Sequence, residues 1–162
     1  MNKHDVISRF ALTKTQIKKI DTYSLELFEF NKHTNLVAKS TLENFWERHI
    51  ADCLQLSTFI SEKKYKIFDF GTGGGLPGVL LSIIGYHNII MIDSVGKKID
   101  FVRNVVNLLS LSAKTQKKRI EKTNLGKPDV IISRALAPLN KLLFYSLLHS
   151  NKKTTSLFLK GR

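Results

Sequence analysis

A cluster of glycines after a short apolar run decides which folds this chain can adopt. Residues 66–70 have the composition of a strand, and five of the eight residues from Gly71 to Gly78 are glycine. Pro77 suits the first turn of a helix that continues to about Ile84. Because glycines let backbone N–H groups approach a ligand closely, this order indicates an α/β fold with a ligand-binding turn. A tight turn without a ligand is the alternative.

The rest of the chain after the glycines alternates between strand and helix patterns. In the run 88–93, residues 89–92 are all apolar, as in a strand that is buried on both faces. Lysines make a strand at 114–119 a weaker prediction. This βαβαβ order predicts a doubly wound parallel sheet with right-handed crossovers. The remaining predicted elements are strands at 129–133 and 156–159 and helices at 97–109 and 139–148.

The first third of the chain has the periodicity of helices. Residues 13–16 have the spacing of a capping box, and an apolar stripe at helical spacing follows as far as Phe30. A second capping box at 40–43 predicts a helix that ends near Ile60. The charged residues 61–64 are the best candidate for a linker between these helices and the rest of the chain. We therefore expect an N-terminal helical extension over 1–64 and a ligand-binding sheet domain over 65–162.

Composition narrows the class of protein. One cysteine, Cys53, excludes an internal disulfide and offers no metal-ligand cluster, and the chain has neither an 18-residue apolar run nor a signal peptide. We expect a soluble, cytoplasmic protein. The net charge is +13, and residues 94–162 carry 15 Lys and Arg against three acids. This asymmetry favours a polyanionic partner, although compositional drift in an AT-rich genome is an alternative.

The register of the glycines favours one ligand class over another. Gly73, Gly75 and Gly78 match a dinucleotide fingerprint, but counting from Gly71 places Leu76 at the third glycine position. Asp69 would repel a pyrophosphate beside the turn. S-adenosylmethionine has a cationic amino group and a sulfonium and no phosphate, so a nearby acid suits it. We therefore expect S-adenosylmethionine, with an NAD-dependent oxidoreductase as the alternative.

Side chains at the ends of later strands complete a candidate cofactor site. Asp93 stands 22 residues after Gly71, where a carboxylate can accept hydrogen bonds from both ribose hydroxyls, or else cap the following helix. Ile120 and Glu121 follow the third strand and could flank the adenine, although an isolated glutamate is usually just solvated. The sequence alone does not decide between ribose binding and helix capping for Asp93, or between an adenine contact and simple solvation for Glu121.

Two further residues are candidates for chemistry. Arg134 follows the fourth strand, where its guanidinium could bind RNA phosphate or guanine O6, or form a structural salt bridge with Asp129 or Glu121. His49 lies on an otherwise apolar helix face, which is more typical of a packed histidine than of a catalyst. Methyl transfer to a nitrogen lone pair needs no general base. The sequence therefore identifies no definite catalytic residue, and Arg134 and His49 are both candidates.

Several motifs together resemble the glucose-inhibited division protein B family. The resemblance runs from about residue 25 to Gly161 in matching order. Members of that family are bacterial methyltransferases that modify guanine N7 in small-subunit (16S) ribosomal RNA. The motifs that carry it are Asn31-Lys32 with Asn35-Leu36, Trp46 to Ile50 with Asp52, Asp69 to Gly78, Ile92 to Ser94 with Lys97-Lys98 and Phe101-Val102, and Ile132 to Ala135 with Pro138.

The resemblance implies a Rossmann-like S-adenosylmethionine-dependent methyltransferase and roles for individual residues. It implies cofactor contacts at Gly71, Leu76, Ile120, Glu121 and Arg134. It also implies that Asn35, Arg48, His49 and Asp52 shape the mouth of the site. Our predicted cofactor set consists of the five implied contacts together with four residues from the turn and the strand ends, Asp69, Gly73, Gly75 and Asp93.

Two departures from the family and one alternative accompany this interpretation. Cys53 stands where the family usually has serine, and the chain stops at Arg162, whereas family members continue for some tens of residues. We therefore expect a sheet that lacks the family's last strands, with an exposed edge at 156–159. A truncated, non-catalytic RNA-binding remnant is the second alternative. We expect a monomer, with no metal, that contacts RNA through Arg48, Lys97, Lys98, Arg103, Lys117, Lys118, Arg119 and Lys122.

Overall fold

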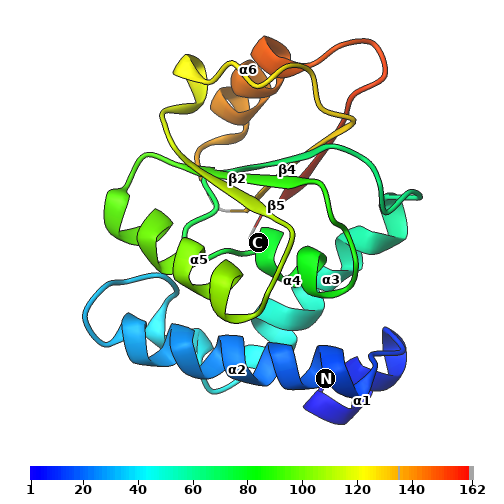
Figure 1. Ribbon diagram of the computed structural model, residues 1–162, viewed down its shortest axis with the longest axis vertical. Helices are drawn as coiled ribbons and strands as arrows, with labels where there is room; N and C mark the ends of the chain where they lie inside the picture. The colour runs from blue at the N-terminus through cyan, green and yellow to red at the C-terminus, as the bar shows by residue number, and fades with distance from the viewer. Residues whose placement is uncertain (135, 161–162) are drawn as a thin grey trace.

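A computed structural model describes residues 1–134 and 136–160, which fold around one parallel sheet (Figure 1). The five strands lie in the order β3-β2-β1-β4-β5. Every pair of neighbouring strands is parallel, which confirms the predicted doubly wound α/β architecture. The strands are β1 (Ile67–Phe70), β2 (Ile89–Asp93), β3 (Lys114–Lys117), β4 (Val130–Arg134) and β5 (Thr155–Leu159).

The order of the strands reverses at β1, and this reversal creates the place where such sheets bind ligands. The chain passes from β1 to β2 and β3 on one side and then returns to β4 and β5 on the other. Phe70 lies opposite Ile92 in β2 and opposite Ser133 in β4. The register therefore brings Asp93 and Arg134, one residue further along, to either side of the turn that follows β1.

Helices cover both faces of the sheet. Figure 1 shows α6 (Leu139–His149) on one side, and α4 (Gly78–Ile83), α5 (Gly96–Leu108) and the N-terminal helices on the other. The N-terminal helices are α1 (Lys3–Arg9) and α2 (Lys14–Asn31), and α2 packs on α4 and α5. One apolar core joins these helices to the sheet, including Ile20 and Leu27 of α2 and Ile67 and Met91 of the strands.

The first predicted helix begins at the predicted residue. Thr13 is the N-cap of α2, and its hydroxyl accepts the Gln16 N–H at 3.2 Å. The Gln16 side chain accepts the Thr13 N–H at 2.9 Å, which completes the capping box. Helix α1, whose N-cap Asn2 forms the same arrangement with Asp5, was not predicted from the sequence.

The second predicted capping box, at residues 40–43, is wrong. A short 3-10 turn, η1 (Lys39–Thr41), occupies this place without a side-chain cap. A box at 40–43 would need Ser40 as the N-cap, but Ser40 lies inside this turn, whose N-cap is Ala38. The helical segment starts later and changes its winding along its length, as η2 (Trp46–Ala51, a π-helix), α3 (Asp52–Leu54) and η3 (Gln55–Phe59).

The two outer strands, β3 and β5, lie at the edges of the sheet, and this position explains the polar sequence of β3. β3 is an edge strand, and its lysines Lys114 and Lys117 are exposed there. β5 pairs only with β4 among the described residues. Ala135 and Gly161, which belong to the family resemblance, lie outside those residues. Within residues 1–134 and 136–160, no helix is long and apolar enough to cross a membrane.

Candidate active site

The glycine turn after β1 is held against β2 by its own backbone. Gly71 and Thr72 both donate their N–H groups to the Ile92 carbonyl, at 2.8 and 3.0 Å. Gly71, Gly73 and Gly75 have φ angles of 67°, 57° and 93°, which residues with a Cβ atom rarely adopt. The turn therefore needs glycine at these three positions for its backbone alone.

The three glycines differ in the space around them. A Cβ on Gly71 would lie 2.3 Å from Leu136 Cδ1, and a Cβ on Gly75 would lie 2.4 Å from Val79 Cγ2. Among the described residues other than its two chain neighbours, no atom is closer than 3.9 Å to a Cβ on Gly73. The space beside Gly73 is thus open, whereas Gly75 is needed for packing on α4.

Asp69 is built into the turn rather than exposed to a ligand. The residue is fully buried, and its Oδ2 accepts hydrogen bonds from the Thr72 hydroxyl at 2.6 Å and the Gly78 N–H at 3.0 Å. Its Oδ1 has no partner within the described part of the chain. Burial raises the pKa of Asp69 to about 7, while the bonds from Thr72 and Gly78 act in the opposite direction. Asp69 therefore shapes the turn that we predicted it would share with the cofactor.

Asp93 connects the turn to the next helix. Its Oδ2 accepts the Gly73 N–H at 2.9 Å, and its Oδ1 accepts the Val95 N–H at 2.9 Å. Val95 is the N-cap of α5, whose first turn has no side-chain cap, so Asp93 fixes the approach to the helix but does not cap it. Because each carboxylate oxygen has a second lone pair, Asp93 can still accept two hydroxyl groups from a ribose.

A cavity of about 150 Å³ lies at the carboxyl edge of the sheet, beside the strand reversal. It brings together four of the predicted cofactor residues: Gly71, Asp93, Ile120 and Glu121. Ile120 and Glu121 belong to a short turn, η4 (Ile120–Lys122), after β3. The other residues around the cavity are Ile92, Ser94, Lys118, Arg119, Leu136 and Tyr145.

Residues of this cavity fit the adenosyl part of S-adenosylmethionine. Ile92 and Ile120 supply apolar walls for a planar ring, and the Asp93 carboxylate supplies acceptors for hydroxyl groups. Leu136 covers Gly71 and, with Tyr145, closes the side toward α6. Neither Leu136 nor Tyr145 was predicted from the sequence, because helical spacing alone does not show which side chains of the α6 region reach this edge.

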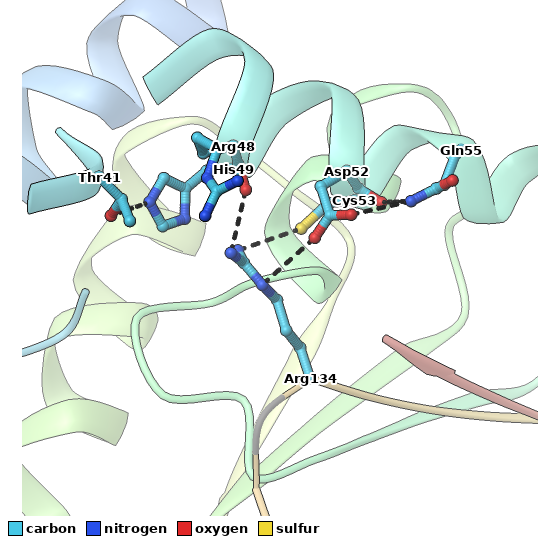
Figure 2. A network of polar contacts seen from close by, with 7 residues as sticks. All are labelled: Thr41, Arg48, His49, Asp52, Cys53, Gln55 and Arg134. Atoms are coloured by element: carbon cyan, nitrogen blue, oxygen red, sulfur yellow. Dashed lines mark hydrogen bonds and ion pairs between the residues drawn. The ribbon is translucent and has the colours of Figure 1, made fainter. Parts of the chain in front are cut away.

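The remaining predicted cofactor residues lie elsewhere. Leu76 is 5% exposed and belongs to the core, and Gly73 and Gly75 are outside the lining of the cavity. Arg134 is also outside that lining, and Figure 2 shows its guanidinium directed at the N-terminal helical segment. The predicted alternative for Arg134, a salt bridge with Asp129 or Glu121, is wrong, since the guanidinium pairs with Asp52 instead.

His49 has the surroundings of a packed, neutral histidine. It is 3% exposed and its ring lies 5.0 Å from that of Phe45. Its Nε2 is 2.6 Å from the Thr41 hydroxyl oxygen. Because this hydroxyl donates its hydrogen to the Ala38 carbonyl, Nε2 must be the donor to Thr41 and therefore carries the ring proton. Burial, followed by the charges of Arg134 and Arg48, lowers the pKa of His49 to about 4. The ring is therefore uncharged at neutral pH.

Most of the predicted RNA-binding residues gather beside the cavity. Lys117 is the last residue of β3, and Lys118, Arg119 and Lys122 follow it. Lys118 and Arg119 line the cavity itself. Lys97 and Lys98 lie at the start of α5, which begins at the same edge of the sheet. Arg103 lies further along α5 and pairs with Asp100, and Arg48 is exposed on η2. No group of three potential metal ligands occurs among the residues described.

Comparison with known proteins decides between the methyltransferase and the oxidoreductase. The family model described as "GidB: rRNA small subunit methyltransferase G" matches residues 16–162. The chain belongs to this family. Among its curated relatives, the ribosomal RNA small subunit methyltransferase G of Rhodospirillum centenum is 34% identical over 158 residues, which are 98% of this chain and 73% of that protein. The protein of the same name from Paramagnetospirillum magneticum is 30% identical over 100% of this chain and 79% of its own length.

Solved structures agree with the GidB assignment at the level of the fold. TehB from Haemophilus influenzae is 20% identical with a TM-score of 0.53, over 66% of this chain and 41% of that one. A mutant of MtNAS in complex with S-adenosylmethionine is 16% identical with a TM-score of 0.59, over 90% of this chain and 55% of that one. The predicted Rossmann-like methyltransferase fold is confirmed.

Proposed function

We propose that this GidB-family chain transfers a methyl group from S-adenosylmethionine to N7 of a guanine in small-subunit (16S) ribosomal RNA. The observation that carries the proposal is the cavity lined by Gly71 of the glycine turn and by Asp93, at the carboxyl edge of the sheet in a member of this family. The chain would act in the cytoplasm as a monomer, and sedimentation of the purified protein can check the monomer.

The residues around the cavity would hold the cofactor, which supplies an electrophilic methyl group on its sulfonium when it is bound. Asp93 would accept hydrogen bonds from the ribose hydroxyls, and Ile92 and Ile120 would enclose the adenine. The open backbone at Gly73 leaves room for the methionyl end. The chain thereby fixes the position of the donor carbon relative to the acceptor.

Orientation is the main contribution that this site can make. Guanine N7 has a free lone pair at neutral pH, so its methylation needs no general base. Asp69 is buried and tied to the turn, and His49 is neutral with a lowered pKa. Holding the nucleophile and the methyl group in line can lower a barrier by up to about 7–11 kcal/mol.

Basic side chains at the same edge would bring the RNA to the cofactor. Lys118 and Arg119 line the cavity, and Lys117 and Lys122 are exposed next to them. Bases of RNA are most accessible in single-stranded loops and bulges, because the major groove of an A-form helix is too narrow for side chains. A loop guanine could therefore enter from this edge while its phosphates contact the lysines.

Labelled S-adenosylmethionine and small ribosomal subunits that lack the modification test the proposal. We expect label in N7-methylguanine, together with tight calorimetric binding of S-adenosylhomocysteine and no binding of NAD. Salt-sensitive RNA binding without any methyl transfer would instead favour the non-catalytic alternative, and NAD binding would favour the oxidoreductase.

A variant of Asp93 tests the placement of the cofactor. Asp93→Ala removes the acceptors for the ribose and should weaken the binding of S-adenosylhomocysteine by at least about tenfold, the loss of one or two hydrogen bonds to a charged group. Asp100→Ala, which removes an exposed carboxylate on α5, is the matched control. Unchanged affinity in a folded Asp93→Ala variant would contradict the ribose role.

A further inference from the structure

The short turn η4, which supplies Ile120 and Glu121 to the cavity, has little support from its own backbone. Its N-cap, Arg119, forms no side-chain cap. The Lys122 N–H donates to the Arg119 carbonyl at 3.0 Å, and one residue further on the Thr123 N–H donates to the Ile120 carbonyl at 3.1 Å. Because a helical turn of this length is not stable by itself, η4 needs contacts from outside to keep its place.

His149, the last residue of α6, provides such a contact. Its Nε2 lies 2.8 Å from the Ile120 carbonyl oxygen, and the residue is 6% exposed. Since a carbonyl oxygen only accepts, Nε2 carries the proton and is the donor. Within the described part of the chain, this is the single hydrogen bond that joins residues 119–123 to another segment.

Two aromatic side chains of β1 fix the orientation of the His149 ring. The ring centroid lies 5.3 Å from that of Phe70 and 6.4 Å from that of Phe68. The interplanar angles are 68° and 75°, the edge-to-face arrangement that aromatic pairs favour. Both phenylalanines are fully buried in an apolar cluster that also contains Ile120. The core under the sheet therefore directs the donor toward η4.

Helix α6 connects this hydrogen bond to the cavity. Tyr145 lies one helical turn before His149 and hence on the same face, and it lines the cavity together with Ile120 and Glu121. Figure 1 shows η4, in yellow, beside α6. The same face of α6 thus forms one wall of the cavity directly and holds a second wall through the hydrogen bond.

We propose that His149 is a positioning residue that holds η4 so that Ile120 and Glu121 stay in place against the adenine of the bound cofactor. The inference rests on the proposed function and extends it, because His149 does not line the cavity and acts through the turn. Without this hydrogen bond, the turn would have to be ordered when the cofactor binds, and the cost of ordering would reduce the affinity.

Two substitutions separate the hydrogen bond from the packing of the ring. His149→Phe keeps an aromatic ring against Phe68 and Phe70 but has no donor, whereas His149→Gln keeps an N–H donor near the position of Nε2 but has no ring. We expect His149→Phe to weaken the calorimetric binding of S-adenosylhomocysteine by about threefold to tenfold, the contribution of one hydrogen bond. His149→Gln should bind it more tightly than His149→Phe does. A residue that only packs would give the reverse order.

The loss should be confined to the adenosyl part of the cofactor and to binding. His149→Phe should weaken the binding of 5′-methylthioadenosine, which has the adenine but lacks the amino-acid part, by the same factor. With small ribosomal subunits as acceptor, KM for S-adenosylmethionine should rise while kcat stays unchanged, because the adenine contacts are equal in the ground state and the transition state. His87→Phe, the same substitution at an exposed histidine before β2, is the matched control and should change neither quantity.

Each result has a definite meaning. An unchanged affinity in His149→Phe, a loss that 5′-methylthioadenosine does not share, or weaker binding by His149→Gln than by His149→Phe would overturn the positioning role. If His149→Phe does not fold, nitrogen-15 NMR of the wild type replaces it: the His149 Nε2–H resonance should shift when 5′-methylthioadenosine binds, and an unshifted resonance would overturn the role.

The failure of this inference is distinguishable from that of the proposed function. A wild-type protein that binds no S-adenosylhomocysteine and transfers no methyl group would overturn both. A wild type that binds and transfers, together with a His149→Phe variant of equal affinity, would overturn the role of His149 alone.

Discussion

Asp69 and His49 are buried titratable residues whose pKa values are shifted in opposite directions. The pKa of Asp69 is raised to about 7, and that of His49 is lowered to about 4. The folded protein therefore binds the Asp69 proton more tightly than the unfolded chain does, and the His49 proton less tightly. Asp69 favours folding below pH 4 and loses this contribution as the pH rises to 7. His49 favours folding above pH 6.5 and loses its contribution as the pH falls to 4.

Replacing Asp69 by asparagine should isolate the first of these effects. The asparagine side chain can still accept the bonds from Thr72 and Gly78 through its amide oxygen, but it does not titrate. Relative to the wild type, the free energy of unfolding of Asp69→Asn should rise by about 2–4 kcal/mol between pH 4.5 and 7.5. Urea denaturation followed by circular dichroism at both pH values measures the change. A difference between the two proteins that does not vary with pH would contradict the raised pKa.

At the level of elements, the cap of α2 is a separable source of stability. Thr13→Ala removes the hydroxyl that accepts the Gln16 N–H, and it should lower the free energy of unfolding by about 1 kcal/mol. Thr15→Ala alters an exposed threonine in the same turn and serves as the control. Thermal unfolding should therefore show a lower midpoint for Thr13→Ala than for Thr15→Ala. Equal midpoints would show that the capping box does not stabilise the fold.

Local patterns predicted the elements well wherever one signal dominated. Glycines, apolar runs and the cap at Thr13 located β1, β2, β4 and the start of α2, because each acts over a few residues. The predicted box at residues 40–43 failed because Ser40, its N-cap, lies inside the short turn η1, and the next helical segment begins only at Trp46. In α6, exposed leucines such as Leu143 and Leu147 make the helix apolar nearly all round, so periodicity located the helix but not its buried face.

The candidate site also contains residues whose position the sequence predicted and a contact that it did not. Gly71, Asp93 and Glu121 converge as predicted, because the carboxyl ends of neighbouring parallel strands meet at one edge of a sheet. The contact between Arg134 and Asp52 joins residues that are far apart in the sequence, and it depends on how the N-terminal helical segment packs. No short-range pattern carries that information.

At the scale of the whole molecule, positive charge is concentrated in the part of the sequence that includes the proposed RNA-binding edge. The net charge is +13, and residues 94–162 carry 15 Lys and Arg against three acids. The cavity has two of these cations, Lys118 and Arg119, on its rim. Since RNA phosphates release counterions when cations bind them, this distribution predicts that RNA affinity falls steeply with salt.

Removing cations from this edge should reduce the dependence of RNA affinity on salt. For a single strand, the slope of log K against log salt changes by about 0.7 for each phosphate that the protein no longer neutralises. Lys117→Ala/Lys118→Ala should therefore reduce the slope by up to about 1.4, as measured by fluorescence anisotropy with a labelled 16S fragment. Lys14→Ala/Lys18→Ala removes the same charge from the exposed side of α2 and should change the slope little. If both double variants reduce the slope equally, RNA responds to the net charge of the molecule, and the edge beside the cavity is not its binding surface.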